Sequence, residues 1–228
     1  MKVNKKGFTI IELLIAMAAF TAMALIASLT ILQIGKMYYK GVTSIEVQNI
    51  TRSTTSAIVE QLQFSKGVVQ TGGAVFGSYT PPETFQSVCV GENRYTFVIN
   101  RIQDKDGIHP TGHTPTEQTI THALWYDKRN DLSVCPPADL GSTVLESTPA
   151  PSSVPGSGRD LLNENMRLTQ FAVTEDVVTH LVDIRIGVIY GDYDLIDWAG
   201  DPVCKGSIVG SQWCAKSLLG TKAYKFLP

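Results

Sequence analysis

The sequence predicts an α+β protein in which one long N-terminal α-helix packs on a C-terminal antiparallel β-sheet domain. Three observations support this fold class. Residues 8–34 form an almost uninterrupted apolar run, and residues 35–66 repeat apolar side chains mostly every three or four positions. Residues 67–228 alternate short strand-like runs with turn residues.

Residues 8–34 form the predicted membrane-spanning half of the helix. This stretch has no Lys, Arg or Asp and a single Glu, Glu12. At helical rise it would be about 40 Å long, which exceeds the roughly 30 Å of hydrocarbon in a bilayer. Lys2, Lys5 and Lys6 precede it without any acidic residue, and positive charge at the entry flank holds that end in the cytoplasm. We therefore expect a single-pass membrane protein with a cytoplasmic N-terminus and an extracytoplasmic C-terminal domain.

Residues 35–66 form the predicted amphipathic half of the same helix. Gly35 and Gly41 weaken it by about 1 kcal/mol each relative to Ala, so we expect a bend near residues 35–41. Polar residues between the apolar ones indicate that one face packs on the C-terminal domain. The apolar positions are Ile34, Tyr38, Val42, Ile45, Ile50, Ala57, Ile58 and Leu62.

Residues 67–228 form the predicted extracytoplasmic β-rich domain. Strand-like runs with short connections are expected to pair as antiparallel hairpins. Residues 136–158 are rich in Pro, Ser, Thr and Gly and almost without charge, which predicts a long, exposed and flexible loop. The three expected hairpins join residues 85–90 to 94–100, 118–127 to 131–135, and 167–176 to 180–191.

The segment KKGFTIIELLIAMAAF, residues 5–20, resembles the N-terminal signal of type IV pilins and type II secretion pseudopilins. The shared features are a short basic leader, Gly7 at the cleavage position, Phe8 as the new N-terminus and Glu12 at the fifth mature position. The resemblance implies that prepilin peptidase removes the leader, residues 1–7, and that Phe8 is N-methylated. It also implies storage in the membrane and assembly, through an inner-membrane platform, into a helical filament with other pilins or pseudopilins.

Glu12 is the assembly residue that this resemblance implies. A carboxylate at depth in a bilayer costs on the order of 2–3 kcal/mol, so it normally has a partner. In the family this glutamate pairs with the terminal amine of a neighbouring subunit, which here is the amine of an adjacent Phe8. Such a pair fixes the register, because any other stagger leaves a charge buried alone. The alternative is a plain signal anchor in which Glu12 lies near the interface by chance.

The four cysteines, Cys89, Cys135, Cys204 and Cys214, all follow the predicted span and show no CxxC spacing. They indicate two disulfides in an oxidising compartment. Four cysteines allow three connectivities. The resemblance favours Cys89–Cys135 and Cys204–Cys214, because the second pair closes a short loop similar to the C-terminal disulfide loop of many pilins.

Charge and motifs argue against several functions. The chain has 19 Lys and Arg against 21 Asp and Glu, without a basic stripe that carries stacking residues, so we expect no direct nucleic-acid binding. No GxSxG, HExxH, Walker A or GxGxxG pattern is present, and we expect neither catalysis nor an organic cofactor. Ca²⁺ is the candidate ligand of one acidic loop, for which a polar turn after a buried strand is the alternative. The carboxylates of that loop belong to Asp192, Asp194, Asp197 and Asp201.

The predicted function is a structural filament subunit, and within that class a minor pilin of a type IV pilus that initiates or caps assembly for motility, adhesion or DNA uptake. The length of 228 residues and the tail from YGDYDLIDWAGDP to SQWC resemble W-type minor pilins and J-type minor pseudopilins. Because pili and secretion systems share the N-terminal signal, a minor pseudopilin of a type II secretion system is one alternative. Another is an adhesin at the filament tip that uses residues 136–158 and 192–201.

Overall fold

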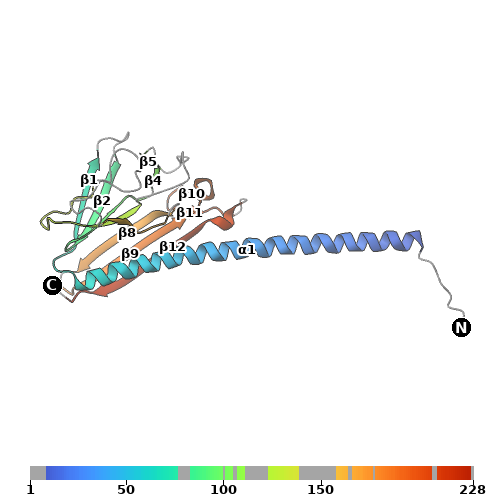
Figure 1. The fold of residues 1–228 in the computed structure, drawn as a ribbon, viewed down its shortest axis with the longest axis horizontal. Helices are drawn as coiled ribbons and strands as arrows, with labels where there is room; N and C mark the ends of the chain where they lie inside the picture. The colour runs from blue at the N-terminus through green and yellow to red at the C-terminus, as the bar shows by residue number, and fades with distance from the viewer. Residues whose placement is uncertain are drawn as a thin grey trace.

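The chain is organised as one long helix and two main antiparallel sheets, which confirms the predicted α+β fold class. In Figure 1 the C-terminal half of the helix lies along the β-rich domain, whereas the N-terminal half projects beyond it. The computed structural model describes residues 9–76, 83–99, 101–104, 107–110, 123–138, 158–163, 166–176, 178–206 and 210–226.

Helix α1 (Ile10–Phe64) is 55 residues long, which corresponds to about 82 Å. Thr9 caps its N-terminus, and the chain becomes extended at Ser65. The helix continues without a break through Gly35 and Gly41, where a bend was expected. Apart from the backbone of the helix itself, a Cβ at either glycine would meet no atom within 4 Å. The two glycines therefore lower the intrinsic stability of the helix without making room for a close contact.

The face of α1 that packs on the domain is rich in threonine, which the sequence analysis missed. Thr51 and Thr55 donate their hydroxyls to the carbonyls of Val47 and Thr51, both at 2.7 Å. Thr54 donates its hydroxyl to the carbonyl of Leu161 at 3.2 Å. Because the hydroxyls are satisfied in this way, these short side chains can be buried against the sheet. The buried residues of the helix are Thr43, Val47, Thr51, Thr54, Thr55, Ile58 and Leu62.

The apolar positions expected to face the domain differ in how far they are buried. Ile58 and Leu62 are buried against it, and Ile50 and Ala57 are half-buried. The prediction was wrong for the exposed positions, which are Ile34, Tyr38, Val42 and Ile45. For the last two the reason is that the domain packs on the side of the helix that carries Thr43. At 3.6 residues per turn, Val42 and Ile45 point away from that side.

The first sheet has five antiparallel strands in the order β1-β2-β3-β6-β7. Strands β2 and β3 pair through a tight turn at Gly91, whose φ of 57° suits glycine. This pairing confirms the first expected hairpin. The strands are β1 (Gln70–Phe76), β2 (Glu83–Val90), β3 (Asn93–Phe97), β6 (Leu124–Lys128) and β7 (Arg159–Asp160).

The second sheet has three antiparallel strands in the order β12-β9-β8, and α1 packs on β12 and β9. The pairing of β8 with β9 confirms the third expected hairpin. Two short ribbons, β4–β5 and β10–β11, and two 3₁₀ turns complete the described structure. The elements are β8 (Met166–Asp176), β9 (Leu181–Tyr190), β12 (Ala215–Tyr224), β4 (Arg101–Asp104), β5 (Gly107–Pro110), β10 (Ile196–Asp197), β11 (Val203–Cys204), η1 (Tyr193–Leu195) and η2 (Ser211–Trp213).

The expected hairpin of residues 118–127 with 131–135 is wrong. Strand β6 pairs with β3 and β7 instead, and the second segment forms no strand. The Cys89–Cys135 disulfide holds that segment against β2. Arg129, two residues before the segment, donates to the carbonyls of Gly91 and Val134, so a disulfide and side-chain hydrogen bonds replace the strand pairing that the sequence pattern suggested.

Residues 136–158, expected to be an exposed loop, are described only at their two ends. Pro137 and Ala138 are buried, and the amide of Ala138 donates to the hydroxyl of Thr96 at 2.8 Å. These two residues of the expected loop are therefore inside the fold, whereas Pro136 before them is exposed. Residues 139–157 lie outside the described residues.

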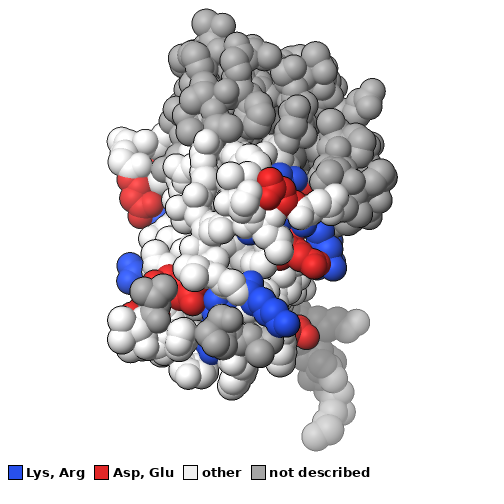
Figure 2. All heavy atoms as spheres, turned by 90° about the vertical axis from the view of Figure 1, so that its left-hand side faces the viewer, with Lys and Arg blue, Asp and Glu red and all other residues white. Residues whose placement is uncertain are grey.

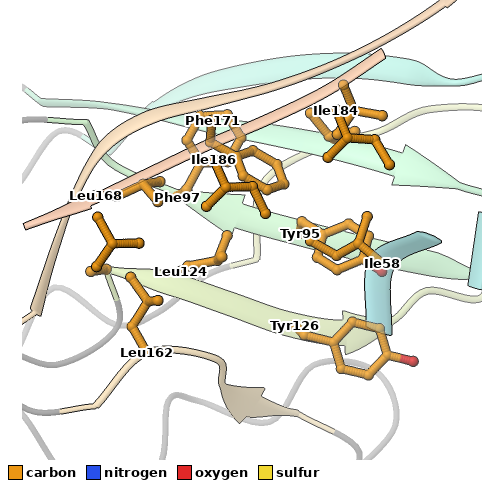
Figure 3. Packing of buried hydrophobic residues seen from close by; sticks show 14 of the residues in the cluster. Ile58, Tyr95, Phe97, Leu124, Tyr126, Leu162, Leu168, Phe171, Ile184 and Ile186 are labelled. Carbon is orange, nitrogen blue, oxygen red and sulfur yellow. The ribbon is translucent and has the colours of Figure 1, made fainter. Parts of the chain in front are cut away.

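The main hydrophobic core lies between the two sheets and the C-terminal half of α1 (Figure 3). The rings of Phe97 on β3 and Phe171 on β8 meet with their centroids 4.7 Å apart. Tyr95 reaches the helix, where its hydroxyl donates to the side chain of Gln61. Burial raises the pKa of Tyr95 far above its usual range, so the hydroxyl keeps the proton that it donates. Further core residues are Ile58, Leu124, Tyr126, Leu162, Leu168, Ile184 and Ile186.

A buried ion pair joins strand β8 to the residue after β12. The side chains of Lys225 and Glu175 are only 1% and 4% exposed, with Nζ 3.2 Å from Oε1. Glu175 also accepts the amide of Val69 at 2.8 Å, and Lys225 donates to the carbonyl of Gly67. We call these four residues the C-terminal clasp. It joins the chain that leaves the helix to strand β8 and to the residue after β12.

Replacing Lys225 with Met is expected to lower the free energy of unfolding by roughly 3–5 kcal/mol, because Glu175 is left buried without its partner. Arg185→Met is the matched control, since the more exposed pair of Arg185 with Asp183 contributes at most about 1 kcal/mol. Urea unfolding of the detergent-solubilised chain measures both variants. Equal losses in the two variants would contradict the role given to the clasp.

Candidate assembly and membrane-anchoring site

The first turn of α1 is closed by reciprocal hydrogen bonds between Thr9 and Glu12. The amide and the hydroxyl of Thr9 both donate to Glu12 Oε2 at 2.9 Å, and the amide of Glu12 donates to Thr9 Oγ1 at 3.3 Å. This capping box satisfies N–H groups that a helix leaves free at its start. Thr9 was not among the residues predicted from the sequence, although Thr-x-x-Glu before an apolar run is the signature of this cap.

Of the expected processing and assembly residues, the structure describes Glu12. Gly7 and Phe8, the cleavage and methylation positions, lie outside the described residues. Glu12 is exposed on the isolated chain, and its bonds to Thr9 hold the carboxylate at the N-terminal end of the helix, where the helix dipole favours a negative charge. The pairing of Glu12 with the amine of a neighbouring Phe8 stays a prediction.

The N-terminal half of α1 is long and apolar enough to cross a membrane, and its most apolar stretch has no residue buried in the domain. Hydroxyl groups along it are bonded to the helix itself. Thr21, Ser28 and Thr30 donate to carbonyls three or four residues earlier, at 2.8–2.9 Å. Because polar groups in a bilayer core need partners within the protein, this surface suits contact with lipid or with other apolar helices.

Two disulfides brace the β-rich domain. Cys89 is bonded to Cys135 and Cys204 to Cys214, the two pairs that the sequence analysis favoured. The first bond joins β2 to the segment after β6. The second closes the loop between β11 and β12, which contains η2. Loop-closure entropy gives such bonds a stabilising contribution of about 2–4 kcal/mol each.

The four carboxylates considered for Ca²⁺ have separate surroundings. Asp201 forms an ion pair with Lys216 at 2.6 Å, and Asp197 accepts the amide of Ala199 at 3.0 Å. In the part of the chain that the structure describes, no group of three or more His, Cys, Asp or Glu side chains is placed to hold a metal ion. Calcium binding by this loop stays a prediction. Its carboxylates belong to Asp192, Asp194, Asp197 and Asp201.

A buried arginine next to this acidic loop was missed by the sequence analysis. Arg167 on β8 is 1% exposed; it donates to the carbonyl of Gly191, and its guanidinium lies 5.3 Å from the ring centroid of Trp198. Burial lowers the pKa of Arg167 to about 10, so the side chain stays charged at neutral pH. These two contacts tie residues 191–198 to the second sheet.

Basic and acidic side chains are interspersed on the end of the domain farthest from the N-terminus (Figure 2). Near the end of α1, Lys66, Glu92 and Lys128 line one groove of about 390 Å³. Across the described residues of this face the view shows no continuous basic stripe of the kind that binds nucleic acid. The absence of nucleic-acid binding itself stays a prediction.

The fold and the site are consistent with a protein that one N-terminal helix anchors in a membrane. The helix has an exposed apolar half with a capped glutamate at its start, and a β-rich domain at its other end. A family model described as the prokaryotic N-terminal methylation motif matches residues 2–28. This motif is the N-terminal segment of type IV pilins and pseudopilins, and the match supports assignment of the chain to that family. No curated protein and no solved structure matched the chain significantly.

Replacing Thr9 with Val removes the hydroxyl of the capping box and is expected to destabilise the first turn of α1 by about 1 kcal/mol. Hydrogen exchange of the amides of Glu12 and Leu13, which donate to Thr9, should become roughly fivefold faster in detergent micelles. Thr9→Ser keeps a hydroxyl at this position and serves as the control. The same exchange rate in all three proteins would show that the box does not stabilise the start of the helix.

Proposed function

We propose that the chain is a minor pilin, a structural subunit of a type IV pilus that helps to initiate or cap the filament. The observation that supports this most is the methylation motif at residues 2–28 on a helix whose N-terminal half is apolar and free of the domain. In this proposal prepilin peptidase cleaves between Gly7 and Phe8, and the inner-membrane platform then adds the subunit to other pilins. The role is structural and not catalytic.

The exposed half of α1 is suited both to the lipid bilayer and to a bundle of similar helices in a filament, the two environments that this function requires. Its apolar side chains can leave lipid for a bundle of similar helices with little change in hydrophobic free energy, because lipid tails and such a bundle are similarly apolar. Specificity must then come from polar groups. Glu12 can exchange its bonds to Thr9 for the amine of a neighbouring Phe8, and a buried pair of this kind fixes the stagger between subunits.

The two ends of the domain differ in the contacts that they offer. The acidic segment 191–198 follows β9 and lies at the end nearest the projecting half of α1 (Figure 1). The opposite end carries exposed aromatic side chains, with Phe64 and Tyr224 at 6.4 and 5.8 Å from Phe226 between ring centroids. Head-to-tail assembly, which gives open filaments, uses different surfaces at the two ends of a subunit.

The processing step gives the first test. The chain recovered from sheared surface filaments should start at N-methylated Phe8, as intact mass and N-terminal sequencing will show. A Gly7→Glu substitution should leave the leader in place and remove the chain from the sheared fraction. Gly35→Ala is the control, because a Cβ there meets no atom within 4 Å apart from the backbone of the helix itself. An unprocessed wild-type chain found only in membranes would refute the proposal.

A tip adhesin is the second candidate, and the exposed aromatic end around Phe226 is the observation that favours it. If the subunit initiates assembly, deletion of its gene should abolish surface filaments, counted by electron microscopy. If it is an adhesin, filaments should persist and only attachment should be lost. If instead protein secretion fails while pili and attachment are normal, the chain is a minor pseudopilin of a type II secretion system.

A further inference from the structure

Three aromatic side chains gather where α1 leaves the domain. The ring centroids of Tyr39 and Trp213 are 4.7 Å apart, and those of Tyr38 and Tyr39 are 5.8 Å apart. All three are exposed, at 67% for Tyr38, 47% for Tyr39 and 44% for Trp213. We call Tyr38, Tyr39 and Trp213 the junction cluster. It consists of apolar surface that the isolated chain leaves open to solvent.

The junction cluster has a fixed position, because Trp213 is held on both sides. It ends the 3₁₀ turn η2, in which its amide donates to the carbonyl of Gly210 at 2.8 Å. The next residue, Cys214, is bonded to Cys204 and leads directly into strand β12. Helix α1 contacts η2 as well as β12. Trp213 is therefore presented at the end of the domain by η2, which contacts the helix and directly precedes the disulfide-bonded Cys214.

The cluster is continuous with the membrane-spanning surface of α1. Exposed apolar side chains run along the helix from Ile10 through Ile34 to Met37, and the domain begins beside the helix only beyond that point (Figure 1). Tyr38 lies about 42 Å along the helix axis from Ile10. This length equals the 40–45 Å of a bilayer that includes its two headgroup regions.

The residue types of the junction cluster are those expected at the headgroup region of a bilayer. Tyr and Trp are enriched at membrane–water interfaces, where the ring meets lipid and the polar atom meets water. Lys36 and Lys40, both exposed, flank Tyr38 and Tyr39 on the helix. Their long side chains can place ammonium groups among lipid phosphates.

We propose that the junction cluster docks the β-rich domain on the outer headgroup region of the bilayer while the subunit is stored in the membrane. The occupant of this surface is the lipid interface, and Trp213 is the part of the domain that enters it. Docking would hold the domain upright on the membrane, because the helix and the disulfide-closed loop then contact the same surface. This inference rests on the proposed function only in requiring that α1 spans the membrane.

Trp213 fluorescence in vesicles tests the proposal. The full-length chain is reconstituted into phosphatidylcholine vesicles with bromine at a shallow or a deep position of the acyl chain, since bromine quenches a nearby indole. The chain has three tryptophans; Trp125 is buried at 8% exposure and Trp198 contacts Arg167. We expect shallow bromines to quench more than deep ones. Trp213→Phe should lose most of this quenching, whereas the control Trp198→Phe should keep it.

Separate readouts distinguish the possible failures. Thermal unfolding shows that Trp213→Phe is folded, and protection of the N-terminal half of α1 from protease shows insertion. An inserted, folded chain with the same bromine quenching in wild type and Trp213→Phe would overturn the docking proposal alone. A chain that fails to insert would overturn the proposed function as well. If Trp213 is shielded only in sheared filaments, a neighbouring subunit covers the cluster and the lipid assignment is wrong.

Discussion

Packing of the C-terminal half of α1 on strands β9 and β12 is the contact on which the rest of the structure depends. It supplies one wall of the core, and it gives the last strand a rigid support. The same helix continues beyond the domain without a break, so the position of the domain fixes the position of the apolar half. One half of the helix packs on the domain and the other half projects from it as an apolar surface. If both halves were equally apolar, nothing in the helix would distinguish the packed half from the projecting half.

Threonine makes that distinction. Thr51, Thr54 and Thr55 fill the packed face with short side chains whose hydroxyls already have acceptors. Glu12 shows a similar principle at the other end of the helix, since its carboxylate is satisfied by Thr9 in the isolated chain. A carboxylate that accepts local hydrogen bonds costs less free energy to keep in the membrane than one without partners.

The features that were predicted correctly from the sequence are those encoded by residues close together in the chain. The apolar run, the glutamate within it and the hairpins with short turns can be read within a few tens of residues. The contacts that were missed join distant parts of the chain or use polar residues in apolar roles. The segment after β6 is held on β2 by the disulfide of Cys135, so it does not pair with β6. The clasp brings together Gly67, Glu175 and Lys225, which are too far apart in the sequence for a periodic pattern to predict their contact. Arg167 lies on strand β8, where a charged residue would ordinarily predict a side chain that faces solvent, yet it is buried.

Strand β12 runs alongside α1 and pairs with β9 over ten positions. At its start lies Trp213 against Tyr39, and just after its end lies the clasp beside the last turn of the helix. The packed half of the helix is therefore held near Tyr39 by Trp213, and in its last turn the carbonyl of Gln63 accepts the amide of Phe226 at 3.3 Å. A tensile force on the projecting half would act along β12, so that its hydrogen bonds to β9 would be sheared together and not unzipped one after another. The domain is consequently built to resist pulling along the axis of its helix more than peeling across it.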